Sequence, residues 1–339
     1  MDLLPSSDQL EIVGSVADLL RDQVPLDLVR KHNPDGEPSA AWTSLADLGL
    51  LGLAIGEELG GIGLGLSEQV LVFRELGRGL TPGPVLGTVL AAHLAADAGD
   101  AALVERIIGG GTRVALAEAY RDPSATIGDT VSGALRVLDP TGSDLTLVVS
   151  PTSAALIESS ALSPTAVSSM DPTVGVATAT ADGVTPVVGA GDHRTWWRGA
   201  ALVAAQQVGI AEATRDASAA YAGLREQYGK PIGMFQAVKH RCADMALRAE
   251  SAYFQTVYAA LAWEGGEAAG TYHLASARVV ASGASRLNSA DNIVNHGAMG
   301  FSDETDAHLY ARRSIVLETT LGTERWHLES IGRTESADW

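Results

Sequence analysis

The residues best placed to do chemistry lie in one short junction, residues 225–236, between two stretches of helical composition. Arg225 offers a planar guanidinium that can hold two phosphate oxygens, Tyr228 offers an aromatic face, and Gln227 adds an amide. Such a set within one turn region is a workable cradle for a pyrophosphate and an adenosine. The same segment also fits a plain helix end followed by a glycine and a proline, and the pattern alone favours this plainer interpretation.

Other catalytic constellations are not visible in the sequence. The eight histidines include no His-Glu-x-x-His motif and no pair at four-residue spacing, so we expect no metal site. There is no Gly-x-Ser-x-Gly motif, and Cys242 lies in an apolar helical stretch that favours a buried structural thiol over a nucleophile. The glycines between Gly60 and Gly65 follow no obvious strand, which favours an inter-helix loop over a dinucleotide site.

Composition narrows the class of protein. Across 339 residues, 23 Lys and Arg against 41 Asp and Glu give a net charge of −18, which would repel a phosphate backbone or an anionic lipid surface. We therefore expect no nucleic-acid partner. One cysteine, no signal-peptide pattern and no apolar run of about 20 residues predict a cytoplasmic protein without a membrane segment.

The chain divides into three zones that differ in composition and in the spacing of apolar residues. Residues 1–112 show helical spacing, with a capping-box pattern from Ser6 to Gln9. Residues 113–190 change to short β-branched runs broken by turn residues, which predicts a small β domain. Residues 191–339 predict an antiparallel four-helix bundle. This order, mainly α with a central small β domain, excludes a Rossmann or TIM-barrel fold.

The boundaries of single elements follow from the same patterns. Ser67 is expected to cap a helix that ends before Pro82. The expected strands are 114–116, 131–138, 145–149 and 174–180, and the expected bundle helices are 196–228, 235–263, 272–295 and 303–321.

Three segments resemble the acyl-CoA dehydrogenases, flavoenzymes that introduce a 2,3-double bond into acyl-CoA thioesters. Residues 225–245 resemble the C-terminal signature of that family, and residues 48–63 with 75–78 resemble its N-terminal helical domain. Residues 295–304 resemble its His-Gly-Gly-x-Gly-Phe-Thr-x-Glu loop, with Ala298 in place of the second glycine. The resemblance implies the family fold: an N-terminal helical domain, a β domain and a C-terminal four-helix bundle.

The family places FAD across a subunit interface, and the resemblance assigns residues of this chain to the ADP half of that cofactor. Arg225, Gln227 and Tyr228 would contact the pyrophosphate, Gln236 would lie nearby, and the turn from Gly297 to Gly300 would approach the adenosine. Val294 stands where the family typically has a Gln. The Thr-Glu-Pro pattern that holds the flavin ring in the family is not matched by residues 117–123.

Neither position that the family uses for its catalytic base carries a carboxylate here. The commoner position precedes a Gly-Thr pair and is Leu321, and the alternative, near the start of the first bundle helix, is Gly199. Glu318 and Glu324 flank Leu321 but fit solvated charges at a helix end, and Asp192, upstream of the first bundle helix, is a weaker candidate than either. The leading hypothesis is therefore the non-catalytic subunit of a heteromeric acyl-CoA dehydrogenase, an α2β2 assembly with a homologous longer partner. The chain resembles the short subunits of actinobacterial enzymes of this kind, some of which act on steroid side chains.

Three other interpretations stay open at this point. The first is a homo-oligomeric acyl-CoA dehydrogenase with a relocated base. The second is a flavin monooxygenase of the same fold, which needs no carboxylate base. The third is a scaffold without a flavin. The acyl chain of an acyl-CoA substrate cannot be named from the sequence.

Overall fold

The structure is a computed structural model that describes residues 3–32, 41–119 and 125–334. The chain forms two compact units: the first contains residues 1–14, 70–81 and 200–339, and the second contains residues 15–69 and 82–199. No helix in these described ranges is both long and apolar enough to cross a membrane.

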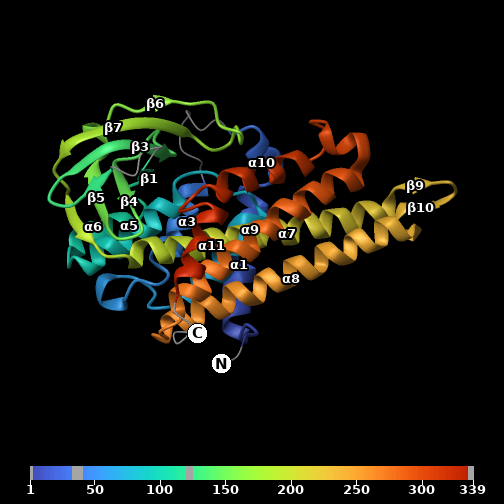
Figure 1. The fold of residues 1–339 in the computed structure, drawn as a ribbon, viewed down its shortest axis with the longest axis horizontal. Coiled ribbons are helices and arrows are strands. Elements are labelled where there is room, and N and C mark those ends of the chain that lie inside the picture. Colours follow the sequence, from blue (N-terminus) through green and yellow to red (C-terminus); the bar gives the residue numbers. More distant parts are fainter. Residues whose placement is uncertain (1–2, 33–40, 120–124, 335–339) are drawn as a thin grey trace. The chain divides into compact units, whose positions relative to one another are not determined.

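Helices dominate both ends of the chain and strands its middle (Figure 1). The helices are α1 Ser7–Gln23, α2 Leu26–Arg30, α3 Ala41–Asp47, α4 Leu66–Arg78, α5 Val85–Asp97, α6 Ala101–Ile108, α7 Arg194–Leu224, α8 Gln236–Glu264, α9 Gly270–His296, α10 Ala307–Glu318 and α11 Glu324–Arg333. The strands are β1 Val114–Ala119, β2 Thr126–Ile127, β3 Val131–Leu138, β4 Leu145–Val149, β5 Ala154–Glu158, β6 Thr165–Ala166, β7 Val176–Val184, β8 Val188–Gly191, β9 Glu226–Gln227 and β10 Lys230–Pro231.

The second unit is built on one mixed sheet. Its strands follow the order β6-β7-β3-β1-β4-β5-β8, with β2 paired to β3. Strands β1 and β4 run parallel and the other neighbours run antiparallel. Helix α5 contacts β1, and the Thr88 hydroxyl accepts a 3.1 Å hydrogen bond from the Val114 N–H.

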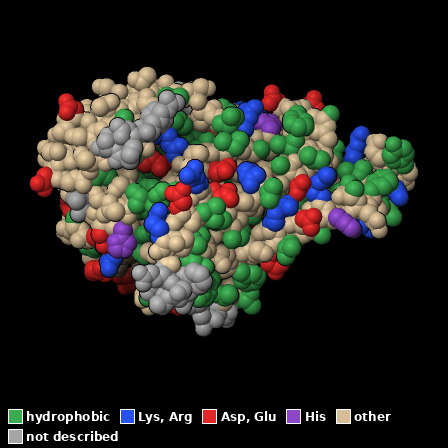
Figure 2. All heavy atoms as spheres, viewed as in Figure 1, with side chains coloured by type: hydrophobic (Ala, Val, Ile, Leu, Met, Phe, Trp, Pro, Cys, Tyr) green, Lys and Arg blue, Asp and Glu red, His purple; other side chains and the backbone are tan. Residues whose placement is uncertain are grey.

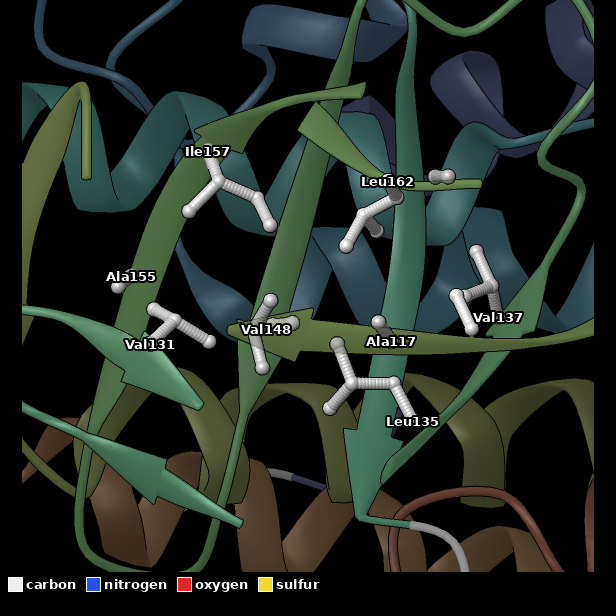
Figure 3. Close-up of a cluster of buried hydrophobic side chains, with 11 residues drawn as sticks. Ala117, Val131, Leu135, Val137, Val148, Ala155, Ile157 and Leu162 are labelled. Atoms are coloured by element: carbon white, nitrogen blue, oxygen red, sulfur yellow. The ribbon is translucent and has the colours of Figure 1, made fainter. Parts of the chain in front are cut away.

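Small and branched apolar side chains fill one face of this sheet. Ala117 comes from β1, Val148 from β4 and Ile157 from β5, and their side chains gather with those of β3 and β7 (Figure 3). Alternate residues of a strand point to the same face, so this cluster lies on one face of the sheet, and β1, β4 and β5 are buried on both faces. The full cluster is Ala115, Ala117, Val131, Leu135, Val137, Val148, Ala155, Ile157, Leu162, Ala179 and Ala181.

The first unit is a helical bundle made mainly by α7, α8, α9 and α10. Helices α8 and α9 make the most extensive contact, and charged side chains tie them together at the surface. The Arg248 guanidinium donates to Asn288 at 2.8 Å and also bonds to Asp291. Arg241 reaches Asn295 at 2.9 Å and Asp291 at 3.3 Å.

The second half of α4 packs against α7 with its backbone. A Cβ atom added to Gly77 would lie 2.1 Å from the Gln206 carbonyl oxygen, and one added to Gly209 would lie 2.0 Å from that of Arg74. Only glycine permits so close an approach. Beside this contact Arg78 pairs with Glu212 at 3.1 Å and with Asp216 at 2.9 Å, so the contact is held by both packing and charge.

The mainly helical fold class with a central β region is confirmed, and the differences lie at element ends. The capping box is formed, since the Ser6 N–H donates to Gln9 and the Gln9 N–H donates to the Ser6 hydroxyl. Ser67 does not cap α4: the helix begins at Leu66, and the Glu68 carboxylate instead accepts from the Gly65 N–H at 2.9 Å. The predicted domain boundaries at residues 112 and 190 separate helical segments from the strand-rich segment, and they stay a prediction.

Several elements were not expected, among them β5 and β8 in the sheet and two elements in the C-terminal region. The first bundle helix ends at Leu224 rather than 228, because a two-stranded hairpin follows it. A fifth helix, α11, begins after the Thr323 hydroxyl accepts a 3.3 Å hydrogen bond from the Trp326 N–H, an N-cap that the sequence patterning missed.

Candidate functional site

The junction after α7 is a tight β-hairpin. Gln227 in β9 pairs with Lys230 in β10, which leaves Tyr228 and Gly229 as the two turn residues. Their φ angles are +54° and +75°, the left-handed pair that a two-residue hairpin turn with the right twist requires. Glycine adopts this conformation without strain, whereas tyrosine does so at a cost of roughly 1–2 kcal/mol.

The hairpin presents its predicted site residues to solvent. Arg225 lies at its base, where its N–H donates to the Tyr221 carbonyl and its carbonyl accepts from the Ile232 N–H, both at 2.8 Å. This fixes the backbone but leaves the guanidinium exposed. Gln227 is exposed, and the Tyr228 side chain is 93% exposed. Gln236 is also exposed, as the first residue of α8.

The second predicted segment, Gly297 to Gly300, forms the turn at the end of α9. Gly297 ends the helix with φ +60°. Gly300 is buried, and a Cβ atom there would lie 2.4 Å from the Ile293 carbonyl oxygen, so a larger residue would open the turn. The main chain of this turn is thereby folded tightly back onto α9.

A ring stack joins the two segments. The Tyr221 and His296 rings lie 4.1 Å apart at an interplanar angle of 26°. The Asn292 carbonyl lies 2.8 Å from His296 Nδ1, which fixes the imidazole. Tyr221 stands one helical turn before Arg225, so the stack links the base of the hairpin to the end of α9. The structure therefore brings the predicted hairpin and turn residues to one end of the bundle.

A buried arginine of α9 binds the main chain of the segment between α10 and α11. Arg278 of α9 is only 1% exposed, and its Nη2 donates to the carbonyls of Leu317 at 3.1 Å, Thr320 at 2.9 Å and Gly322 at 3.2 Å. Its Nη1 bonds to the Gln207 amide oxygen. A guanidinium with several donors suits the carbonyls at a helix C-terminus, where the helix dipole is negative.

Leu321 lies at the centre of this segment. Its side chain is 0% exposed and its φ is +54°, and its carbonyl accepts a 3.0 Å hydrogen bond from His327 Nε2. Burial, and next the nearby charge of Arg278, lower the pKa of His327 to about 3, although the bond to Leu321 acts in the opposite direction. His327 is therefore a neutral donor, and Arg278 and His327 together form a clamp on the turn.

The other base position and the other candidate carboxylates lie in ordinary helix or helix-end environments. Gly199 is buried within α7 and offers no titratable group. The Asp192 carboxylate accepts from the Arg194 N–H at 2.8 Å and pairs with the Arg194 side chain at 3.5 Å, so it serves the start of α7. Glu318 ends α10 and Glu324 begins α11, and both are half-buried.

The segment compared with the family's flavin-ring loop is described only in part. Ala117 of β1 is buried in the sheet core, and Glu118 pairs with Arg136, which lies directly opposite on β3. Ala119 ends the strand and is exposed. The described part of this segment therefore offers no hydroxyl group, and residues 120–123 lie outside the described residues.

Comparisons with known proteins decide the family. The acyl-CoA dehydrogenase N-terminal domain matches residues 6–111, and the acyl-CoA dehydrogenase C-terminal domain matches residues 197–335. The chain belongs to the acyl-CoA dehydrogenase family. It is 33% identical over 307 residues to the acyl-CoA dehydrogenase IpdE2 of Mycobacterium tuberculosis, covering 90% of this chain and 88% of that protein.

Solved structures agree with this assignment. A steroid acyl-CoA dehydrogenase variant, Tcur3481-Tcur3483, matches with a TM-score of 0.84 and 25% identity over 96% of both chains. A chain of the ChsE4-ChsE5 complex from Mycobacterium tuberculosis shares the fold, with a TM-score of 0.87 and 24% identity over 98% of both chains. Family membership supports an FAD-dependent flavoprotein oxidoreductase that acts on a CH–CH bond.

Several residues of the site were missed from the sequence alone. Tyr221, Arg278 and His327 organise the two turns but belong to none of the motifs noticed. The spacing of four between Tyr221 and Arg225 was an available signal, because residues at that spacing share a helix face. Arg278 gave no signal in the sequence, since a buried arginine cannot be told from a surface one without its tertiary partners.

Proposed function

We propose that this chain is a subunit of a heteromeric FAD-dependent acyl-CoA dehydrogenase and lacks a catalytic base of its own. The observation that carries the proposal is Leu321: the residue at the family's usual base position is a fully buried leucine. A leucine cannot remove the proton next to a thioester, a step in which a positioned base contributes roughly 10²–10⁴-fold in rate. The carboxylate would come from a homologous, longer partner subunit.

In this proposal the hairpin completes the partner's FAD site. FAD, when bound, supplies the acceptor for the hydride that leaves the acyl chain. The Arg225 guanidinium would hold the pyrophosphate, with Gln227, Tyr228 and Gln236 beside it. The tight turn from Gly297 to Gly300 would bring main-chain N–H groups to the adenosine side. The exposed donor set fits a diphosphate, and an exposed arginine at the base of the hairpin is accessible to a ligand outside its own chain.

The ring half of the cofactor would belong to the partner. The described part of the segment from Ala117 onward offers no hydroxyl to the flavin, and its Glu118 is already paired with Arg136. The proposed assembly is an α2β2 tetramer. The names Tcur3481-Tcur3483 and ChsE4-ChsE5 each join two components, and the former is a steroid enzyme. We extend both properties to this chain as a proposal, with the acyl-CoA of a steroid side chain as substrate.

Expression of the chain alone and with a flavin-bearing acyl-CoA dehydrogenase subunit tests the proposal. The isolated chain should be colourless or substoichiometric in FAD and inactive on any acyl-CoA, and the co-expressed complex should be yellow. Stoichiometric FAD and turnover from the isolated chain would contradict the proposal and favour a homo-oligomeric enzyme with a relocated base. FAD bound without acyl-CoA turnover, but with oxygen consumption, would favour the monooxygenase.

A further inference from the structure

Three polar side chains from three helices meet in the second unit. The Arg198 guanidinium of α7 donates from Nη1 to the Gln69 side-chain oxygen of α4 at 2.7 Å. The Gln69 side-chain nitrogen lies 3.1 Å from Nε2 of His93 on α5. Gln69 is only 1% exposed, so its amide is enclosed between the two other groups. We call Gln69, His93 and Arg198 the polar triad.

The polar triad fixes which ring nitrogen of His93 carries the hydrogen. Arginine can only donate, so the Gln69 amide must turn its oxygen toward Arg198 and its NH2 group toward His93. That NH2 group needs a bare Nε2 as its acceptor, and the neutral ring then carries its hydrogen on Nδ1. An imidazolium does not fit, because both of its nitrogens are donors. Burial, and next the charge of Arg198, hold the pKa of His93 well below its usual value, in agreement with a neutral ring.

The His93 ring and a leucine share the partly open face of α5. His93 and Leu86 are both half-buried, and their spacing of seven places them on one face of the helix, about 10 Å apart. Val89 and Leu90, which lie between them in the chain, are buried. Within the described ranges, the hydrogen bond of His93 is made through Nε2, and none is made through Nδ1. This face therefore offers one N–H donor at the end of an apolar surface.

A positive charge lies close to this donor. Arg198 is half-buried, and a charge withdrawn from water is screened less by salt than an exposed one. The hairpin differs, since Figure 2 shows hydrophobic and positively charged side chains at the surface over β9, β10 and the start of α8. Arg198 also directly precedes Gly199, where the family's alternative base is missing. The local field of Arg198 favours an acceptor oxygen that carries negative charge.

We propose that the His93 Nδ1–H group binds the carboxylate of a medium-chain carboxylic acid, whose hydrocarbon chain lies along α5 toward Leu86. Gln69 is the positioning residue, because it holds the ring in the tautomer that donates from Nδ1. The chain binds this ligand without converting it. The inference goes beyond the proposed function and needs neither a partner subunit nor FAD, so its failure and that of the proposed function are distinguishable.

Nitrogen NMR of the full-length chain, labelled with ¹⁵N-histidine, tests the tautomer. His93 should show a protonated Nδ1 and a bare Nε2, and the loss of signals in His93→Asn identifies them. Gln69→Glu introduces a carboxylate that can only accept, so Nε2 should become protonated in this variant. A protonated Nε2 in the wild type, or a bare Nε2 in Gln69→Glu, would overturn the proposal.

Binding of sodium octanoate to the full-length chain, followed by calorimetry and by the same NMR signals, tests the ligand. Octanoate should shift the His93 Nδ1 signal and bind at least tenfold more tightly than acetate, which lacks the hydrocarbon chain. His93→Phe keeps an aromatic ring without the donor and should weaken octanoate binding about tenfold. His93→Asn, whose amide places an N–H group near the Nδ1 position, should recover part of the affinity. His240→Asn, at an exposed histidine of α8, is the matched control and should change nothing.

Three binding results would overturn the proposal. The first is octanoate binding that leaves the His93 signals unchanged, or no octanoate binding at all. The second is equal octanoate affinity of wild type and His93→Phe, with circular dichroism showing that both are folded. The third is acetate binding as tight as that of octanoate. The wild-type titration uses no variant, so it decides the question even if His93→Phe does not fold.

Discussion

Two turns of this protein share a pair of successive positive φ angles but differ in their burial and in the contacts that hold them. Tyr228-Gly229 and Leu321-Gly322 each place a residue with φ +54° before a glycine with positive φ. Tyr228 is 93% exposed, whereas Leu321 is 0% exposed and its turn is held by Arg278 and His327. Strain of this kind persists only where the surroundings enforce it. The first turn is enforced by hairpin pairing and faces outward, and the second is enforced by the bundle and faces inward.

The outward turn is available to bind other molecules, whereas the inward turn contributes to the stability of the chain itself. Beside the outward turn, Arg225 and Lys230 form no ion pair with any described residue. The inward turn carries the family's base position, and there the polar groups of the bundle bind the turn's main chain. Substitutions in the two turns should therefore have opposite signatures: loss of stability at the inward turn and loss of binding at the outward turn.

The largest expected effect is on stability and comes from Arg278. Replacing it with methionine keeps the bulk but removes a donor from three carbonyls and from the Gln207 amide oxygen. Loss of a buried, multiply bonded guanidinium should reduce the free energy of unfolding by about 3–5 kcal/mol. Urea unfolding followed by circular dichroism measures the loss. Arg278→Lys should recover part of it, and Arg225→Met should leave the urea midpoint of the isolated chain unchanged.

Equal urea midpoints for Arg278→Met and Arg225→Met would contradict this difference between the two turns, because the inward turn would then need no clamp.

The clamp should also make the protein sensitive to acid. An unfolded histidine titrates near 6.5, and the folded-state pKa of His327 is about 3, so the unfolded chain binds the extra proton over that range. Stability from this site is complete above pH 6.5 and falls progressively as the pH drops toward 3, by up to about 5 kcal/mol. His93, whose pKa is lowered well below its usual value by burial and by Arg198, adds a loss of the same sign.

Urea midpoints measured between pH 7 and pH 4 test this dependence. His327→Gln should lower stability at pH 7 but flatten its decline toward pH 4, because the amide keeps a donor and cannot bind the proton. His240→Gln, at an exposed histidine of α8, serves as the control and should keep the wild-type slope. A wild-type slope in His327→Gln would mean that His327 is not buried in its neutral form.

At the outward turn the expected loss is of flavin. Arg225→Ala should lower the flavin affinity of the assembled complex about ten- to hundredfold, since a charge-assisted contact contributes roughly 1.5–3 kcal/mol. Arg225→Lys should restore only part of the affinity, because an ammonium cannot reproduce the planar fork. Flavin absorbance per complex measures the occupancy, and unchanged occupancy in the alanine variant would reduce Arg225 to a surface residue.

The sequence was most informative where the structure depends on residues close together in the chain. Capping at Ser6 and Gln9, strands β3 and β4, and the change from helix to β-branched texture all rest on neighbours in the chain, and the structure agrees with them. The sequence analysis expected a helix end here and not a hairpin. Tyrosine rarely adopts a positive φ, so Tyr228 gave no indication of a turn. Only the pairing of Gln227 with Lys230 makes that conformation favourable.

The contacts that hold the inward turn could not be predicted from the sequence pattern. Its clamp joins Arg278 to carbonyls 39 to 44 residues away, and a main-chain acceptor leaves no trace in side-chain identity. The burial of Leu321 likewise depends on tertiary packing. What the residues did reveal is the absence of a carboxylate at that position, which is the chemical fact on which the proposed function depends.

The smallest expected effect concerns the two carboxylates beside Leu321, and it decides whether this chain supplies the catalytic base. The measurement is the turnover number of the assembled complex carrying both Glu318→Gln and Glu324→Gln, with flavin content determined on the same sample. An amide keeps the shape and removes only the proton-accepting charge. We expect turnover within about twofold of wild type. A fall of about 10² or more with flavin intact would contradict it, because this chain would then carry the base.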